Sequence, residues 1–168
     1  MLKQTKQIMM LLSICAVISA CSDSSETKAE SSSGNDSNIV NLRGDDVGMN
    51  AAKAKGNATL PRFEELISAK TPGTYSFKTG LPYGENNFEH VWVQLDKIDG
   101  DTFHGKIANE PVNAKDYKLG QVISVDRAEL SDWMIMSDTA IYGGYTLREI
   151  LPTLPKEQAE GFRALLKD

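Results

Sequence analysis

The chain has 168 residues, of which 40% are apolar, 7% aromatic and 24% charged, a composition typical of one globular domain with short attachments. Its formal charge of -5 argues against a broad electrostatic contact with a phosphate backbone, so we do not expect nucleic acid as a partner. Two cysteines are too few for a disulfide scaffold or a tetrahedral zinc site, and we expect neither a metal nor a cofactor.

The N-terminus has the three parts of a bacterial lipoprotein signal. Lys3 and Lys6 give a positive start, and the apolar run at 8–18 is shorter than the roughly 20 residues that span a bilayer. The run ends in Ile18-Ser19-Ala20-Cys21, which resembles a lipobox, where small residues precede the cysteine that is acylated. The sequence therefore predicts a signal peptide at 1–20, the alternative being an ordinary secretory signal with a chance cysteine.

Cleavage before Cys21 removes Cys15, so no free thiol remains after acylation. Acyl chains contribute about 0.8 kcal/mol per buried CH2, so several chains on Cys21 hold the protein on a membrane without an amphipathic helix. Ser22 rather than Asp follows the cysteine, which resembles lipoproteins passed on to the outer membrane. We expect a location in the bacterial cell envelope, lipid-anchored at the periplasmic face of the outer membrane.

A Ser-rich stretch follows the cysteine. Residues 22–38 contain no large apolar side chain and cannot offset the entropy of ordering themselves, so they form a tether with a mean reach of about 23 Å. We therefore divide the chain into a signal peptide at 1–20, a lipidated cysteine with its tether at 21–44, and a single domain at 45–168.

The domain opens with two expected helices. Asp45-Asp46 place negative charge at the start of the first helix, and Gly56-Asn57 supply a stop. Leu60-Pro61 begin the second helix, because proline is tolerated in a first turn. On this helix three apolar residues share one face, namely Phe63, Leu66 and Ile67.

Strands are expected next. Tyr75 and Phe77 indicate a strand, with an irregular loop at Gly80–Gly84. Residues 88–107 predict a hairpin around Gly100, for which two registers are open. A two-residue turn sets Leu95 opposite His104, whereas a three-residue turn with left-handed Gly100 pairs Leu95 with Phe103 and buries one consistent face. We favour the second register.

The rest of the domain completes the fold class. Further strands are expected at 121–125, 133–136 and 140–145. Thr146 and Glu149 have capping-box spacing, and a last helix starts at Pro155. The pattern predicts an α+β domain with N-terminal helices, a curved antiparallel sheet or small partial barrel of about five strands, and C-terminal helices.

The sequence contains few residues in the arrangements that catalytic sites use. The chain has no Gly-x-Ser-x-Gly elbow, no phosphate-binding loop and no His-Glu-x-x-His motif. The two histidines, His90 and His104, are expected about 13 Å apart, at about 3.3 Å per strand residue, too far to share one metal. Each histidine on its own is more often a solvent-exposed strand residue than a functional one.

Two groups of residues are candidates for binding. On one face of the hairpin, His90, Trp92 and Gln94 combine a ring with hydrogen-bonding groups, as small-molecule and peptide sites do, although a covering helix explains such a face equally well. If the face is open, strand addition by an extended peptide or saccharide stacking on Trp92 are the expected modes.

The second group lies between the later strands and the short helix that follows them. It consists of Asp132, Trp133, Tyr145 and Arg148. Asp132 and Arg148 are candidates for an ion pair across adjacent elements, with a purely structural pair as the alternative.

Four blocks of sequence carry a resemblance to a known family. They are Glu89-His90-Val91-Trp92-Val93, Gly105-Lys106-Ile107-Ala108-Asn109-Glu110-Pro111, Asp132-Trp133-Met134 and Gly144-Tyr145-Thr146-Leu147-Arg148. In this order they resemble the YegJ-like family of bacterial proteins, a domain of unknown function, over about residues 45–152. The resemblance implies domain limits and assigns no catalytic residue.

Three functions stay open. The first is a non-enzymatic, membrane-tethered envelope protein that binds a partner protein, a peptide or a glycan. The second is an envelope hydrolase that uses His90 or Asp132. The third is an inhibitor or immunity-type protein.

Overall fold

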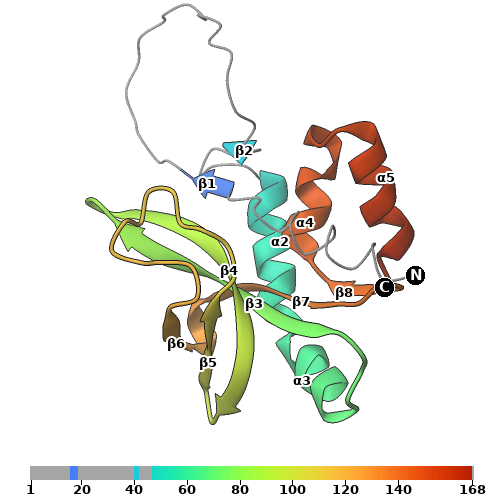
Figure 1. Ribbon diagram of the computed structural model, residues 1–168, viewed down its shortest axis with the longest axis horizontal. Helices are drawn as coiled ribbons and strands as arrows, with labels where there is room; N and C mark the ends of the chain where they lie inside the picture. The colour runs from blue at the N-terminus through green and yellow to red at the C-terminus, as the bar shows by residue number, and fades with distance from the viewer. Residues whose placement is uncertain (1–15, 19–39, 42–46, 168) are drawn as a thin grey trace, which may run out of the picture.

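A computed structural model describes residues 16–18, 40–41 and 47–167 of the chain (Figure 1). Cys21, the Ser-rich stretch at 22–38 and the Asp45-Asp46 pair lie outside the described residues. Helices precede and follow an open antiparallel sheet in the chain, so the predicted α+β class is confirmed.

Four α-helices flank the sheet in the described residues: α2 (Val47–Ala58), α3 (Leu60–Ser68), α4 (Tyr145–Ile150) and α5 (Lys156–Leu165). Two 3-10 turns, η2 (Arg127–Glu129) and η3 (Leu151–Thr153), connect elements. Figure 1 shows α4 and α5 side by side, with α2 between them and the sheet.

Six strands of the domain form the sheet: β3 (Thr74–Tyr83), β4 (Asn87–Asp99), β5 (Thr102–Ile107), β6 (Val122–Asp126), β7 (Leu130–Met136) and β8 (Ile141–Gly143). Their order across the sheet is β6-β5-β4-β3-β7-β8, all antiparallel. The sheet curves without closing, because its end strands β6 and β8 do not pair. Two short strands extend it at β4: β1 (Ala16–Ile18) and β2 (Val40–Asn41).

The predicted end of the first helix is wrong. α2 continues through Gly56 and Asn57 to Ala58. A Cβ on Gly56 would lie 2.8 Å from the carbonyl oxygen of Ser131 and 2.9 Å from Cα of Asp132. The glycine therefore permits α2 to lie directly on β7, and this packing outweighs the low helix propensity of glycine.

The predicted irregular loop at Gly80–Gly84 is also wrong in most of its length. β3 stays paired with β4 as far as Tyr83 opposite Asn87. The reversal occurs in the few residues between them, where Gly84 and Asn86 take positive φ angles of 55° and 59°. Those two residue types adopt this backbone most readily, so they fix the position of the turn.

Neither predicted register of the β4–β5 hairpin is correct. Asp99 pairs with Thr102, which leaves a two-residue turn whose Gly100 is left-handed, with φ 58°, as expected. A bulge between Leu95 and Lys97 then shifts the register, and Val93 pairs with Ile107. An extra residue reverses the alternation of sides, so Ile98 turns to the same side as Leu95 and both pack on the core.

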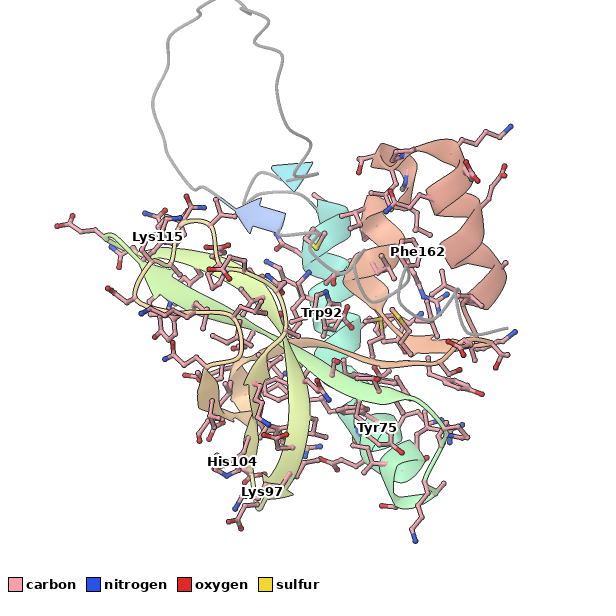
Figure 2. The ribbon with its side chains drawn as sticks, viewed as in Figure 1. Tyr75, Trp92, Lys97, His104, Lys115 and Phe162 are labelled. Atoms are coloured by element: carbon pink, nitrogen blue, oxygen red, sulfur yellow. The ribbon has the colours of Figure 1, made fainter. Side chains whose placement is uncertain are left out.

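Two hydrophobic cores occupy opposite sides of the sheet. The first lies between the curved sheet and α3, and its largest members are Trp133, Phe63, Phe77 and Phe103. The second is formed by Trp92 with residues of α2, β7, α4 and α5, such as Met49, Met134 and Phe162. Figure 2 shows Trp92 in the middle of the molecule and Phe162 among the C-terminal helices. β7 is buried along its whole length because both cores cover it.

The predicted capping box of α4 is wrong, whereas α5 begins after Pro155 as expected. The N-cap of α4 is Gly144, whose φ of 63° is left-handed and which has no side chain to cap the helix. Thr146 lies inside the helix and its hydroxyl donates to Asp132 instead. A carboxylate distant in sequence thus takes the place of the local cap.

Gly105 provides a test of this packing. A Cβ at Gly105 would lie 2.2 Å from the carbonyl oxygen of Gln94, so the Gly105→Ala chain is expected to lose about 1–3 kcal/mol of unfolding free energy through overpacking. Gly161 in α5 has nothing within 4 Å, and Gly161→Ala is expected to gain up to about 1 kcal/mol. Urea unfolding measures both, and equal stabilities of the two variants would contradict the hairpin geometry.

Candidate functional site

The carboxylate of Asp132 joins β7 to the start of α4. It is fully buried, and Oδ1 accepts hydrogen bonds from the backbone N–H of Trp133 (2.8 Å) and of Tyr145 (3.2 Å). Oδ2 accepts from the backbone N–H and the hydroxyl of Thr146, both at 2.7 Å. The N–H groups of Tyr145 and Thr146 lie in the first turn of α4 and have no partner within the helix, so the carboxylate satisfies them.

Lys78 of β3 extends this junction. Its Nζ donates to the hydroxyl oxygen of Thr146 at 3.1 Å and lies 5.3 Å from the centre of the Trp92 ring. Burial raises the pKa of the Asp132 carboxyl, and the hydrogen bonds from Thr146 together with the charge of Lys78 oppose this rise only in part. The polar groups in this enclosed junction are thus partnered with one another.

His90 on β4 lies beside the same junction. Its Nδ1 is 3.1 Å from Oγ of Ser131. Because the Ser131 hydroxyl donates to the carbonyl oxygen of Lys78, we infer that Nδ1 is the donor and that Nε2 keeps its lone pair. Burial, followed by the charges of Lys53 and Lys78, lowers the pKa of His90 to about 3. The ring is therefore neutral at physiological pH.

A pocket of about 650 Å³ occupies the opening between β3 and β6. β7 pairs with β3 only as far as Thr79, and in the described residues β6 pairs with β5 alone, so two strand edges border the pocket. Its apolar lining comes from Leu81, Pro82, Phe88, Ile123 and Val125. Its polar lining comes from Thr79, His90, Ser124 and Glu129. A mixed lining of this kind and size is typical of small-ligand and peptide sites.

The structure brings together four of the candidate residues. The Trp133 and Tyr145 rings meet edge to face at 6.2 Å, and Cζ of Arg148 lies 5.9 Å from the centre of the Tyr145 ring. Asp132 contacts the start of the same helix. The candidate pair of Asp132 with Arg148 is not formed, because the guanidinium donates to the backbone carbonyls of Gly143 and Lys167.

Other candidates lie apart from this group. Trp92 and Trp133 are 6% and 1% exposed, so neither ring offers an open surface for a stacked sugar. Gln94 is exposed on β4, whereas His90 lines the pocket. His104 pairs with Lys97 near the end of the hairpin, farther from His90 along β4 than expected. Figure 2 shows His104 and Lys97 at that end.

Sequence reasoning missed Glu89 and Asn109 as structural anchors. The buried Glu89 carboxylate accepts hydrogen bonds from the backbone N–H of Val112, Asn113 and Ala114, at 2.6, 2.6 and 2.8 Å. Oδ1 of Asn109 accepts from the backbone N–H of Trp92 at 2.7 Å. The signal available in the sequence was an acidic residue in an otherwise apolar strand, which needs buried partners.

Two features are absent from the described part of the chain. No three His, Cys, Asp or Glu side chains there are grouped so as to hold a metal ion. None of the helices there combines the length and the apolar character needed to cross a membrane.

The comparisons with known proteins assign a family. A family model described as "Uncharacterized protein conserved in bacteria (DUF2314)" matches residues 46–166. The chain therefore belongs to this family of bacterial α+β proteins. The match includes all four helices and all six strands of the domain.

Two curated relatives are similar to the chain. The uncharacterized protein YegJ of Escherichia coli (strain K12) is 30% identical over 122 residues, which are 73% of this chain and 79% of YegJ. A putative ankyrin repeat protein of Neisseria meningitidis serogroup B is 29% identical over 70 residues, which are 42% of this chain and 28% of that protein. No solved structure matches the chain.

The lowered pKa of His90 predicts a pH dependence of stability. The unfolded chain takes up this proton near pH 6.5 and the folded chain only near pH 3, so the stability that neutral His90 contributes is complete above pH 6.5. It is lost as the pH falls from 6.5 towards 3. In His90→Gln, urea unfolding between pH 6.5 and 5 is expected to show a smaller decline than in the unchanged chain.

The control is the other histidine. His104→Gln replaces a ring on β5 that contacts Ser124 of β6 and lies away from Lys53 and Lys78, and this variant is expected to keep the decline of the unchanged chain. A decline in His90→Gln as steep as that of His104→Gln would show that His90 is not buried in its neutral form.

Proposed function

We propose that this protein is a lipoprotein of the bacterial envelope, anchored by acyl chains on Cys21 at the periplasmic face of the outer membrane. Its domain is a non-enzymatic binding module for a partner protein, a peptide or a glycan. The anchor is supported by the order of charged start, apolar run and Ile18-Ser19-Ala20-Cys21.

The pocket between β3 and β6 carries the binding function. Its 650 Å³ is in the range of ligand pockets, roughly 300–1,000 Å³, and it has hydrogen-bonding side chains at intervals along an apolar wall. The open strand edges beside it add backbone donors and acceptors to these side chains. An extended segment of a partner therefore finds both apolar contact and polar partners at this place.

The geometry disfavours the hydrolase that uses His90 or Asp132. Asp132 is 0% exposed, and its two oxygens together accept four hydrogen bonds, so a substrate atom does not reach it. His90 reaches the pocket, but a pKa of about 3 makes it a weak base near neutral pH. Burial of Asp132 and the low basicity of His90 therefore both count against the hydrolase.

Replacement of Cys21 tests the anchor. Cys21→Ser is expected to retain the signal peptide and to lack acyl chains, because the acylated sulfur is the point of attachment. Cys15→Ser is the matched control and is expected to be processed and lipidated normally, since Cys15 lies within the removed segment. Intact mass and membrane fractionation measure both variants. An unchanged location and mass of Cys21→Ser would contradict the proposal.

Sorting between membranes is tested separately. Ser22→Asp keeps the acylated cysteine and changes only the residue after it. We expect this variant to move from the outer to the inner membrane fraction in a density gradient. An outer-membrane location of the variant would contradict the proposed sorting while leaving the anchor intact.

A photo-crosslinking amino acid at Glu129 tests the pocket. Glu129 is exposed and lines the pocket, so we expect the amino acid to capture a discrete envelope component in living cells. The same amino acid at Lys97, exposed at the far end of the hairpin, is expected to capture nothing comparable (Figure 2). Identical products from both positions, or none from Glu129, would contradict binding at the pocket.

A further inference from the structure

The long strand β4 has different partners along its length. β3 borders one side of it from Asn87 to Gln94. On the other side β5 begins only at Val93, and at Trp92 the backbone N–H donates to Asn109 while the carbonyl accepts from Ala108. In the described residues, β1 is the strand that borders the remaining stretch, Phe88–His90.

β1 is seated on this edge in an antiparallel register. Ala16 lies opposite His90, Val17 opposite Glu89 and Ile18 opposite Phe88. The outer side of β1 is bordered in turn by β2, which runs parallel to it. The edge of β4 therefore accepts an extended chain, and an Ala-Val-Ile segment is the one that it holds here.

β1 lies within residues 1–20, the segment that the proposed signal peptidase cleavage removes. After this cleavage the edge of β4 at Phe88–His90 loses the strand that borders it. Unpaired backbone N–H and C=O groups along a strand edge favour the addition of another strand.

We propose that the edge of β4 at Phe88–His90 is a strand-addition site of the mature protein. It binds an extended apolar segment of a partner protein, antiparallel to β4, and β1 occupies it before processing. The inference rests on the proposed processing before Cys21 and adds a binding place on β4 that is distinct from the strand edges of β3 and β6 beside the pocket.

The chemistry of the edge favours an apolar peptide over a glycan or a charged ligand. Phe88 is a large apolar side chain that is 51% exposed at one end of the site. The carboxylate of Glu89 accepts from the 112–114 backbone and is fully buried, so it is directed away from the incoming strand. His90 at the other end is neutral at physiological pH because its pKa is about 3.

One further occupant has to be distinguished. β2 runs parallel to β1, so Val40–Asn41 already has the direction that pairing with β4 requires. This segment remains in the mature chain and is able to replace β1 without reversing its course. The experiment therefore includes a variant that removes its ability to pair.

The experiment uses residues 21–168 with Cys21→Ser. The described members of both hydrophobic cores lie between Met49 and Leu166, and the 21–168 chain retains all of them. The probe is a synthetic peptide of residues 13–20 with Ser at position 15. The backbone N–H groups of Phe88 and His90 face the same side of β4 as that of Trp92, toward the added strand, and their exchange is expected to slow by about tenfold or more when the peptide is added. The same peptide with Ile18→Pro lacks the backbone donor opposite Phe88 and is expected to have no effect.

The register is tested with a spin label. A label at the N-terminus of the peptide is expected to broaden the amide resonance of His90 more than that of Phe88, since Ala16 pairs with His90. Equal protection by the proline peptide, broadening in the reverse order, or no protection by the unchanged peptide would overturn the proposal.

The competing occupant has its own outcome. If the amides of Phe88 and His90 in the 21–168 chain are protected without peptide, and Val40→Pro abolishes this protection, the edge belongs to the chain itself and the proposal is overturned. Lipidation is measured independently from the mass of the full chain extracted from membranes. Peptide binding without lipidation would reject the anchor alone, and lipidation without peptide binding would reject the strand-addition site alone.

Discussion

The fold depends on one buried carboxylate. Asp132 holds the first turn of α4 against β7, and through Thr146 it is connected to Lys78 on β3. α2 crosses the same point, where the absence of a side chain on Gly56 lets the helix approach Asp132. Removal of a buried acceptor that satisfies several donors leaves those donors unpaired, which costs more than the net value of each hydrogen bond. Four elements distant in sequence therefore meet at one ionisable group.

Sequence patterns predicted the class of fold and failed where a distant contact decides the local structure. Amphipathic spacing was sufficient for α3, because Phe63 and Leu66 reach the core from one face. Gly56 has the sequence character of a helix stop, yet its packing on Asp132 keeps the helix continuous. Thr146 has the spacing of a capping residue, yet its hydroxyl serves a carboxylate 14 positions away. The contacts of Gly56 and Thr146 with Asp132 produce no periodic pattern in the sequence from which they could be predicted.

The sequence predicted which residues gather near the start of α4, but it did not predict their contacts or the position of the pocket. Asp132, Trp133, Tyr145 and Arg148 do gather around one helix start, but as packing and hydrogen-bonding partners of the fold. The pocket lies elsewhere, between β3 and β6, because β7 leaves β3 at Thr79 and the sheet does not close. Such an opening follows from strand lengths and a bulge, which alternation of apolar residues does not specify.

The last residues of the described chain cover the outermost strand. Leu166 forms a parallel bridge with Ile141 of β8, and the backbone N–H of Lys167 donates to the carbonyl oxygen of Ile141 at 2.9 Å. Repeated head-to-tail stacking of one molecule on the next needs two complementary free borders on every copy. With its own tail along β8, the sheet has no free border at that end for Ile141 to offer. The tail therefore opposes the addition of another strand at Ile141.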